Sequence, residues 1–165
     1  MKTILSTLMA AAVATTVTQA FTIDFNALVV PLNTTVTVGS PLTIPVAGYG
    51  DVRFEASGTD VLTVSNNHSN GSGTFQNSLE LDPGETVTVV FLGPQELNVN
   101  FDIIGVNAGE SATPTISGPR TYQLQAIGGD GVGVAAISWD AVPEPSSSLL
   151  VLLGAGSLVL RRSRG

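Results

Sequence analysis

The chain has 165 residues, no cysteine and a formal net charge of −7 at pH 7. The absence of cysteine excludes disulfides, a thiol nucleophile and a cysteine-ligated zinc site. Residues 21–145 contain two basic residues, Arg53 and Arg120, against all thirteen acids of the chain, a net charge of −11. Nucleic-acid binding is excluded because it requires a basic surface, whereas this acidity fits solubility outside the cell, adaptation to salt or loose binding of divalent cations.

The first 20 residues have the layout of a cleavable signal peptide. Lys2 supplies the positive charge, residues 4–17 form a modest apolar stretch, and Ala20 is the small residue before the expected cut by signal peptidase. The apolar stretch is too short and too weak for a permanent membrane span. We therefore predict export, with residues 1–20 as signal peptide and 21–141 as the mature domain.

The mature domain has the periodicity of β-strands. In residues 97–103 every odd position is apolar, from Leu97 to Ile103, and every even position is polar, which places one face in a core and the other in water. No segment shows sustained helical spacing. We predict an all-β fold, an antiparallel sandwich of the jelly-roll or immunoglobulin-like kind. The remaining strands are predicted at 22–25, 34–38, 42–46, 52–56, 61–64, 78–81, 85–92, 121–127 and 132–139.

Turn residues separate these strands. Residues 82–85 read Asp-Pro-Gly-Glu and predict a tight turn. The glycine-rich residues 128–133 are interpreted as a turn rather than a phosphate loop, because a strand and not a helix follows them. Residues 66–73 and 107–119 are predicted to be polar loops.

Candidate ligand residues are few. Asp24 and Asp140, on the first and last predicted strands, are the candidates for a structural calcium ion, with ordinary surface carboxylates as the alternative. Tyr49 is the more exposed candidate for sugar binding, or else a packed loop residue. Trp139 shares a strand face with Ile137 and is expected in the core.

No constellation of catalytic residues is visible in the sequence. His68 is the only histidine and lies in the polar loop 66–73, so we interpret it as a solvent-exposed residue without a catalytic role. There is no Gly-x-Ser-x-Gly elbow, and thirteen acids give no specific carboxylate pair. We predict that the protein is not an enzyme.

Residues 142–165 form a separate C-terminal segment. Prolines on both sides of Glu144 forbid a regular helix or central strand and leave an extended backbone that a protease can bind. The apolar stretch 147–160 is predicted to be a short transmembrane helix of about 20 Å, shorter than a hydrocarbon core of about 30 Å. We expect transient rather than permanent insertion, although an ordinary anchor with local bilayer thinning is the alternative.

The order of Pro-Glu-Pro, short apolar helix and arginine cluster resembles the PEP-CTERM sorting signal. The residues that carry this resemblance are Pro143, Glu144, Pro145, the stretch 147–160, Arg161, Arg162 and Arg164. The arginines would form the cytoplasmic stop. The resemblance implies processing by exosortase, a membrane-embedded transpeptidase-like enzyme that cuts near Pro-Glu-Pro, and an association with exopolysaccharide or biofilm matrix.

We therefore expect an exported protein of the cell envelope, outer surface or extracellular matrix, with a structural or adhesive role. Its expected partners are signal peptidase, exosortase, exopolysaccharide and, transiently, the inner membrane. The alternative is a carbohydrate-binding module, with or without calcium, and a hydrolase is the third hypothesis.

Overall fold

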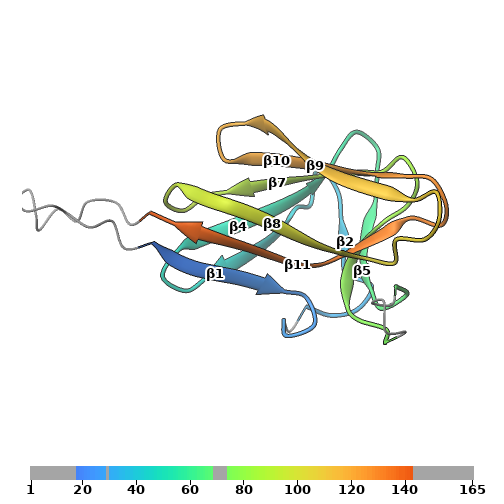
Figure 1. Ribbon diagram of the computed structural model, residues 1–165, viewed down its shortest axis with the longest axis horizontal. Helices are drawn as coiled ribbons and strands as arrows, with labels where there is room; N and C mark the ends of the chain where they lie inside the picture. The colour runs from blue at the N-terminus through green and yellow to red at the C-terminus, as the bar shows by residue number, and fades with distance from the viewer. Residues whose placement is uncertain (1–17, 29, 69–73, 143–165) are drawn as a thin grey trace, which may run out of the picture.

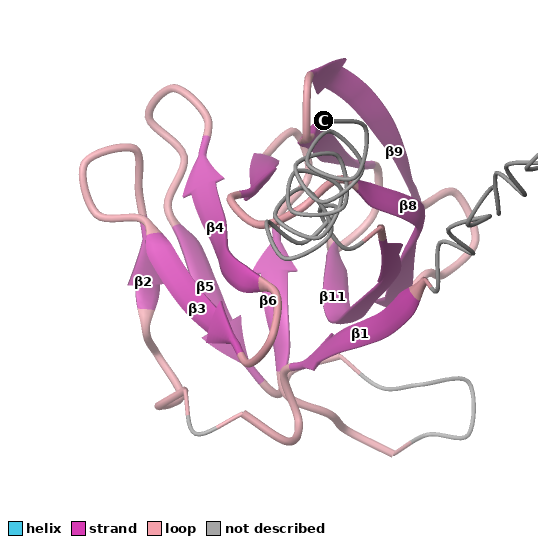
Figure 2. Cartoon of the chain, turned by 90° about the vertical axis from the view of Figure 1, so that its left-hand side faces the viewer, coloured by secondary structure: helices cyan, strands magenta, loops and turns pink. Residues whose placement is uncertain are grey.

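The computed structural model describes residues 18–28, 30–68 and 74–142. Most of the predicted signal peptide and the predicted tail from residue 143 lie outside these residues. The described residues form eleven strands joined by loops (Figure 2). Within that part of the chain there is no helix long and apolar enough to cross a membrane.

The strands form two antiparallel sheets, which confirms the predicted all-β class (Figure 1). The six-stranded sheet contains, in spatial order, β1 (Gln19–Asp24), β11 (Val132–Ala141), β6 (Ser78–Leu81), β5 (Leu62–Ser65) and β2 (Thr35–Val36), with β8 (Glu96–Ile104) also paired to β11. The five-stranded sheet has the order β3 (Leu42–Val46), β4 (Gly50–Ala56), β7 (Thr86–Phe91), β10 (Thr121–Ile127) and β9 (Ser111–Gly118).

A single hydrophobic core joins the sheets. Ile137 of the six-stranded sheet and Phe54 and Leu124 of the five-stranded sheet are all fully buried members of it. The alternation of apolar and polar residues along each strand produces this arrangement, because it turns one face of each sheet toward the other. The two-layer architecture is therefore of the sandwich type, and its jelly-roll or immunoglobulin-like kind stays a prediction.

All ten predicted strands are present, with small shifts at their ends, but an eleventh was missed. Strand β9 lies within residues 107–119, which the sequence predicted to be a loop. Six of its eight residues are exposed, so its side chains do not alternate between a buried and an exposed face. It is an edge strand held by backbone pairing to β10 alone, and such pairing leaves no hydrophobic period in the sequence.

A β-bulge changes the predicted face of β8. Ser138 pairs with Asn100 and Asp140 with Leu97, so three residue steps on β8 oppose two on β11. Asn98 takes the left-handed conformation, with φ 52°. Because β8 has one extra residue at this bulge, the side chains before it, at 96 and 97, point to the opposite faces from those predicted. Leu97, predicted in the core, is 38% exposed, and Glu96 is buried instead, at 8% exposure.

Prolines occupy the free edges of the five-stranded sheet. Pro114 pairs with Leu124, whose backbone N–H and C=O point to the same side of β10 as those of Ala126, two residues further on. The N–H and C=O of Ala126 bond to Glu85 and Gly84, on the side away from β9. Pro114 therefore turns its nitrogen to the free edge. The same reasoning applies to Pro45, because the carbonyl of its partner Asp51 accepts a bond from Leu92 on the β7 side. Each edge therefore lacks one backbone N–H donor at its proline, which opposes pairing with another strand.

The two ends of the domain lie side by side. Gln19, the first residue of β1, pairs with Ala141, the last of β11 (Figure 1). We call this the chain-exit end. The loops 82–85, 105–110 and 128–131 lie at the other end, which we call the loop end. It is about 27 Å away, the length of the eight residue steps from Gly133 to Ala141 along β11. The predicted cut after Ala20 falls inside β1 and stays a prediction.

Candidate functional site: the polar cluster at the loop end

The side chain of His68 is largely shielded from solvent, which corrects its interpretation as an exposed loop residue. Its side chain is 10% exposed. The segment after β5 folds back so that the imidazole lies against Gly105 and Gly133. A Cβ at Gly105 would overlap Nδ1, and a Cβ at Gly133 would lie 3.2 Å from Cδ2 and overlap the Ser78 hydroxyl. The two glycines therefore form the niche that holds the ring.

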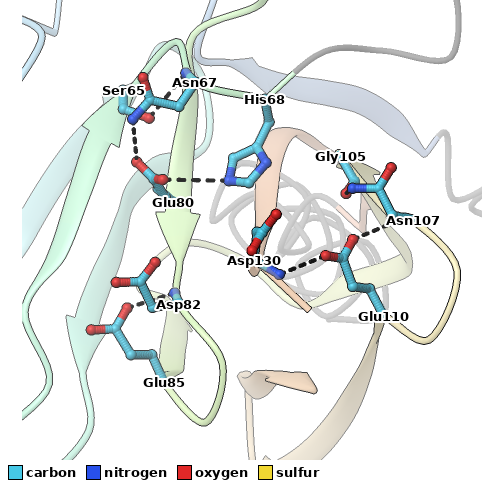
Figure 3. A network of polar contacts seen from close by, with 10 residues as sticks. All are labelled: Ser65, Asn67, His68, Glu80, Asp82, Glu85, Gly105, Asn107, Glu110 and Asp130. Atoms are coloured by element: carbon cyan, nitrogen blue, oxygen red, sulfur yellow. Dashed lines mark hydrogen bonds and ion pairs between the residues drawn. The ribbon is translucent and has the colours of Figure 1, made fainter. Parts of the chain in front are cut away.

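Glu80 of β6 connects this histidine to the sheet (Figure 3). Its Oε1 lies 3.5 Å from Nε2 of His68, and its Oε2 accepts a hydrogen bond from Nδ2 of Asn67 at 3.2 Å. The backbone N–H of Asn67 in turn donates to Oγ of Ser65 at 3.3 Å. Adjacent residues of the loop thus reach one carboxylate, and the segment is held onto β5 and β6.

Glu110 joins two of the loops at this end. Its Oε2 accepts the N–H of Asn107 at 2.5 Å, and its Oε1 accepts the N–H of Asp130 at 2.7 Å (Figure 3). These backbone hydrogen bonds lower the pKa of Glu110 below its ordinary value, and the nearby His68 acts in the same direction. A carboxylate is stabilised by such donors because they favour its charged form.

Acid should therefore weaken this connection. Because the pKa of Glu110 is lowered on folding, its contribution is present above its unfolded value of 4.5 and is lost as pH falls through the folded value. Glu110→Gln cannot accept both N–H groups, so we expect its melting temperature at pH 7 to lie a few degrees below that of wild type. Between pH 5 and 3 the melting temperature of the variant should fall less than that of wild type. Thermal unfolding followed by circular dichroism measures both. Asp102→Asn, an exposed acid of β8, is the control, and an unchanged acid dependence in Glu110→Gln would contradict the assignment.

The cluster does not have the arrangement of a hydrolase. Ser78 is fully buried and its hydroxyl has no hydrogen-bond partner, so it makes no bond to the imidazole. Nε2 of His68 is directed at Glu80 rather than at a hydroxyl. Nucleophilic catalysis needs a base that bonds the nucleophile and a third group that orients the base.

The two predicted calcium ligands do not meet. Asp24 pairs in register with Ala136, whereas Asp140 pairs with Ala20, four residues further along β11. Their carboxylates are engaged separately: Asp24 Oδ1 accepts the N–H of Asn26, and Asp140 Oδ2 accepts Nδ2 of Asn98, both at 2.8 Å. The expectation of one calcium ion held by both residues is therefore corrected, because it assumed that pairing strands brings their acids to one level.

Tyr49, the candidate for sugar binding, is packed in the core, which agrees with the alternative of a packed residue. It is 5% exposed, and its hydroxyl donates to the carbonyl of Pro94 at 2.9 Å. Its ring packs edge-on against Trp139 at 5.1 Å and Phe91 at 6.2 Å. Trp139 is 2% exposed, which confirms its predicted place in the core. These rings form an aromatic cluster near the chain-exit end, with Phe21 stacked on Trp139.

Strong alkali should destabilise the domain through Tyr49. Burial, followed by the charge of Glu96, raises the pKa of Tyr49 to about 12. Below its unfolded pKa near 10 the hydroxyl is neutral in both states, and from there to about 12 the unfolded chain ionises first, so stability falls as pH rises. Tyr49→Phe should lose about 1 kcal/mol at pH 8 with its hydrogen bond, but decline less between pH 10 and 12. Urea unfolding at several pH values measures this, and equal declines in both proteins would refute it.

Sequence reasoning missed Glu80, Glu110 and the two glycines of the niche as site residues. Gly129 and Gly131 have positive φ, as the predicted turn requires, but Gly133 lies within β11. A glycine inside a strand is a signal for close approach of another group. Which group approaches could not be read from the sequence, because His68 comes from a distant segment.

Comparison with known proteins identifies the C-terminal segment. Residues 141–164 match the family model described as the PEP-CTERM protein-sorting motif. No curated protein and no solved structure matches the chain. The fold and the match together define an exported protein built on two antiparallel sheets. More particularly, it carries the PEP-CTERM motif, the signal of exosortase-type sorting to the cell envelope or surface.

The predicted sorting residues fall within the matched range but outside the described residues, and these are Pro143, Glu144, Pro145, Arg161, Arg162 and Arg164. The match begins at Ala141, the last residue of β11. Ala20, the predicted signal-peptidase position, lies in β1. The sorting motif therefore follows the closing strand of the domain without a linker.

Proposed function

We propose that the chain is a non-enzymatic protein of the cell surface or extracellular matrix with a structural or adhesive role. The observation that carries this proposal is the start of the sorting motif at Ala141, beside the first strand of the domain. Because both ends of the domain lie at the chain-exit end, anything that holds the tail presents the loop end outward. Signal peptidase, exosortase, a transient membrane insertion and association with exopolysaccharide complete the proposal.

Three further features support a passive, displayed domain. The proline-blocked edges oppose uncontrolled strand pairing between crowded copies. The net charge of −11 over residues 21–145 favours solubility and mutual repulsion. The His68 cluster lacks a bonded nucleophile. All three features suit a module that is exposed in many copies without reacting.

Changing the sorting motif should trap the protein before release. In the native host, we expect the mature wild-type protein to lack residues 1–20 and the tail, and to fractionate with the envelope or matrix. Replacing Pro143, Glu144 and Pro145 together by Ala removes the residues that exosortase is expected to recognise, so the variant should keep its tail and stay with the inner membrane. Intact mass spectrometry of each fraction measures both outcomes.

The neighbouring triple replacement of Ser146, Ser147 and Ser148 by Ala is the matched control and should be processed normally. Deleting the host's exosortase should reproduce the Pro-Glu-Pro result. A wild-type mature protein that retains residues 146–165 would refute the sorting part of the proposal.

A carbohydrate-binding role remains the alternative within the same proposal. Of the nine aromatic residues, all in the described part of the chain, Phe75 is the exposed one, at 64%. Sugar-binding surfaces use exposed rings, so this role would depend on Phe75 rather than on Tyr49. Glycan-array binding that Phe75→Ala abolishes would favour it, whereas binding by neither protein would favour the structural role.

A further inference from the structure

A gap separates the imidazole of His68 from the carboxylate of Glu80. Nε2 and Oε1 are 3.5 Å apart, beyond the usual range of about 2.7–3.2 Å for an N–H···O hydrogen bond. Nε2 is fully shielded from solvent and has no hydrogen-bond partner. Buried polar atoms without a partner are rare, because each costs free energy that folding must recover elsewhere. The two atoms therefore form at most a loose ion pair, and Nε2 has no closer partner.

The separation suits a metal ion. Zinc lies about 2.1 Å from imidazole nitrogen and carboxylate oxygen, so two ligand atoms in a tetrahedral arrangement are about 3.4 Å apart. The observed distance of 3.5 Å agrees with this value. We propose that His68 Nε2 and Glu80 Oε1 bind one divalent transition-metal ion of the zinc class, with water reaching the remaining coordination positions from the side of Glu80, whose side chain is 20% exposed. This site goes beyond the proposed function, which requires no metal.

Neighbouring residues hold both ligands in position. Asn67 donates to Oε2 of Glu80, which leaves Oε1 to face the imidazole. Gly105 and Gly133 fix the ring by contact on its other atoms. Glu80 lies on β6, which is paired on both sides, with β5 and β11. Hydrogen bonds to a ligating carboxylate and a rigid supporting element are the features that orient metal ligands in proteins.

The charge around the site favours a cation. The carboxylate of Glu110 lies close enough to His68 to interact with it electrostatically. The two arginines of the described residues are engaged elsewhere, Arg53 with Glu55 at 3.1 Å and Arg120 with the carbonyl of Gly93. No arginine of that part of the chain therefore competes with the proposed ion for Glu80.

The donor set selects the class of metal. Imidazole suits zinc, copper and nickel, whereas calcium and magnesium require oxygen ligands alone. The described residues contain no group of three or more His, Asp or Glu side chains arranged for a metal ion. The protein thus supplies two ligands, and we expect weaker binding than at a closed four-ligand structural site.

Zinc titration of the untagged full chain in mild detergent tests the proposal. Because His68 is the only histidine, ¹⁵N-histidine labelling yields the signals of one imidazole without mutagenesis. We expect Zn²⁺ to shift the Nε2 resonance with one ion bound per chain, and Ca²⁺ to leave it unchanged. Isothermal titration should show at least tenfold weaker binding in His68→Gln and in Glu80→Gln, and about tenfold weaker binding in Asn67→Ala.

Asp51→Asn, which removes an acid from the other sheet, is the matched control and should bind zinc as wild type does. Circular dichroism confirms that each variant is folded, and the labelled wild-type chain provides the result even if one is not. An imidazole that Zn²⁺ leaves unchanged would overturn the proposal. So would a shifted imidazole with undiminished affinity in Glu80→Gln, because the ion would then be held by histidine alone.

Discussion

Replacing Trp139 by Ala is expected to remove about 4 kcal/mol of stability, the largest effect of any single substitution that we predict. The indole is 2% exposed and lies within 5.8 Å, between ring centroids, of Phe21, Tyr49 and Phe91. Removing it leaves a cavity that three rings cannot close without losing contact with one another. Since domains of this size are stable by only about 5–15 kcal/mol, a large share of the variant would be unfolded at 37 °C.

Urea unfolding followed by far-ultraviolet circular dichroism measures this loss, since the variant has no tryptophan for fluorescence. Ile116→Ala, at a residue of β9 that is 77% exposed, is the control and should cost less than about 0.5 kcal/mol. A loss below about 1 kcal/mol in Trp139→Ala would show that the aromatic cluster is not packed as the structure has it.

Gly105→Ala is expected to cost about 3 kcal/mol of stability, the second largest effect among our predictions. Two causes combine. Gly105 has φ +75°, which costs a residue with a Cβ about 1–2 kcal/mol, and the added methyl group would overlap Nδ1 of His68. The imidazole must then leave its niche, and Nε2 loses its position beside Glu80.

A double-mutant cycle separates the two causes. In a His68→Ala background the overlap is gone, so Gly105→Ala should cost only the backbone share of about 1–2 kcal/mol. Gly109→Ala is the matched control, because Gly109 also has positive φ, +89°, but has no atom near the position of a Cβ. Equal costs in both His68 backgrounds, measured by urea unfolding, would contradict the packing of His68 against Gly105.

The strands could be predicted where local pattern and burial agree. Trp139 and Ile137 alternate with polar neighbours, and both are buried in β11 as expected. Strand β9 was missed because exposure on both faces leaves no alternation. The exchange of Leu97 and Glu96 depends on the bulge at Asn98, which is a property of the pairing with β11 and not of β8 alone.

The candidate site was less accessible to sequence reasoning. The polarity of residues 66–73 correctly indicated a loop, yet His68 is nine-tenths buried because that loop folds back onto β6 and β11. Asp24 and Asp140 were placed on paired strands, but the register separates them by four residues, about 13 Å. Tyr49 lies in the core because its ring packs against Phe21, Phe91 and Trp139, which come from other segments of the chain.

The all-β class, most strands and the sorting motif could be predicted because each depends on the local order of residues: alternation along a strand, or Pro-Glu-Pro followed by an apolar stretch and arginines. Which polar groups lie in contact depends instead on the packing of distant segments in the folded chain. The meeting of His68, Glu80 and the two niche glycines depends on strand register and loop closure across 65 residues of chain, from 68 to 133. Such contacts arise from packing between distant segments, and no periodicity within one segment encodes them.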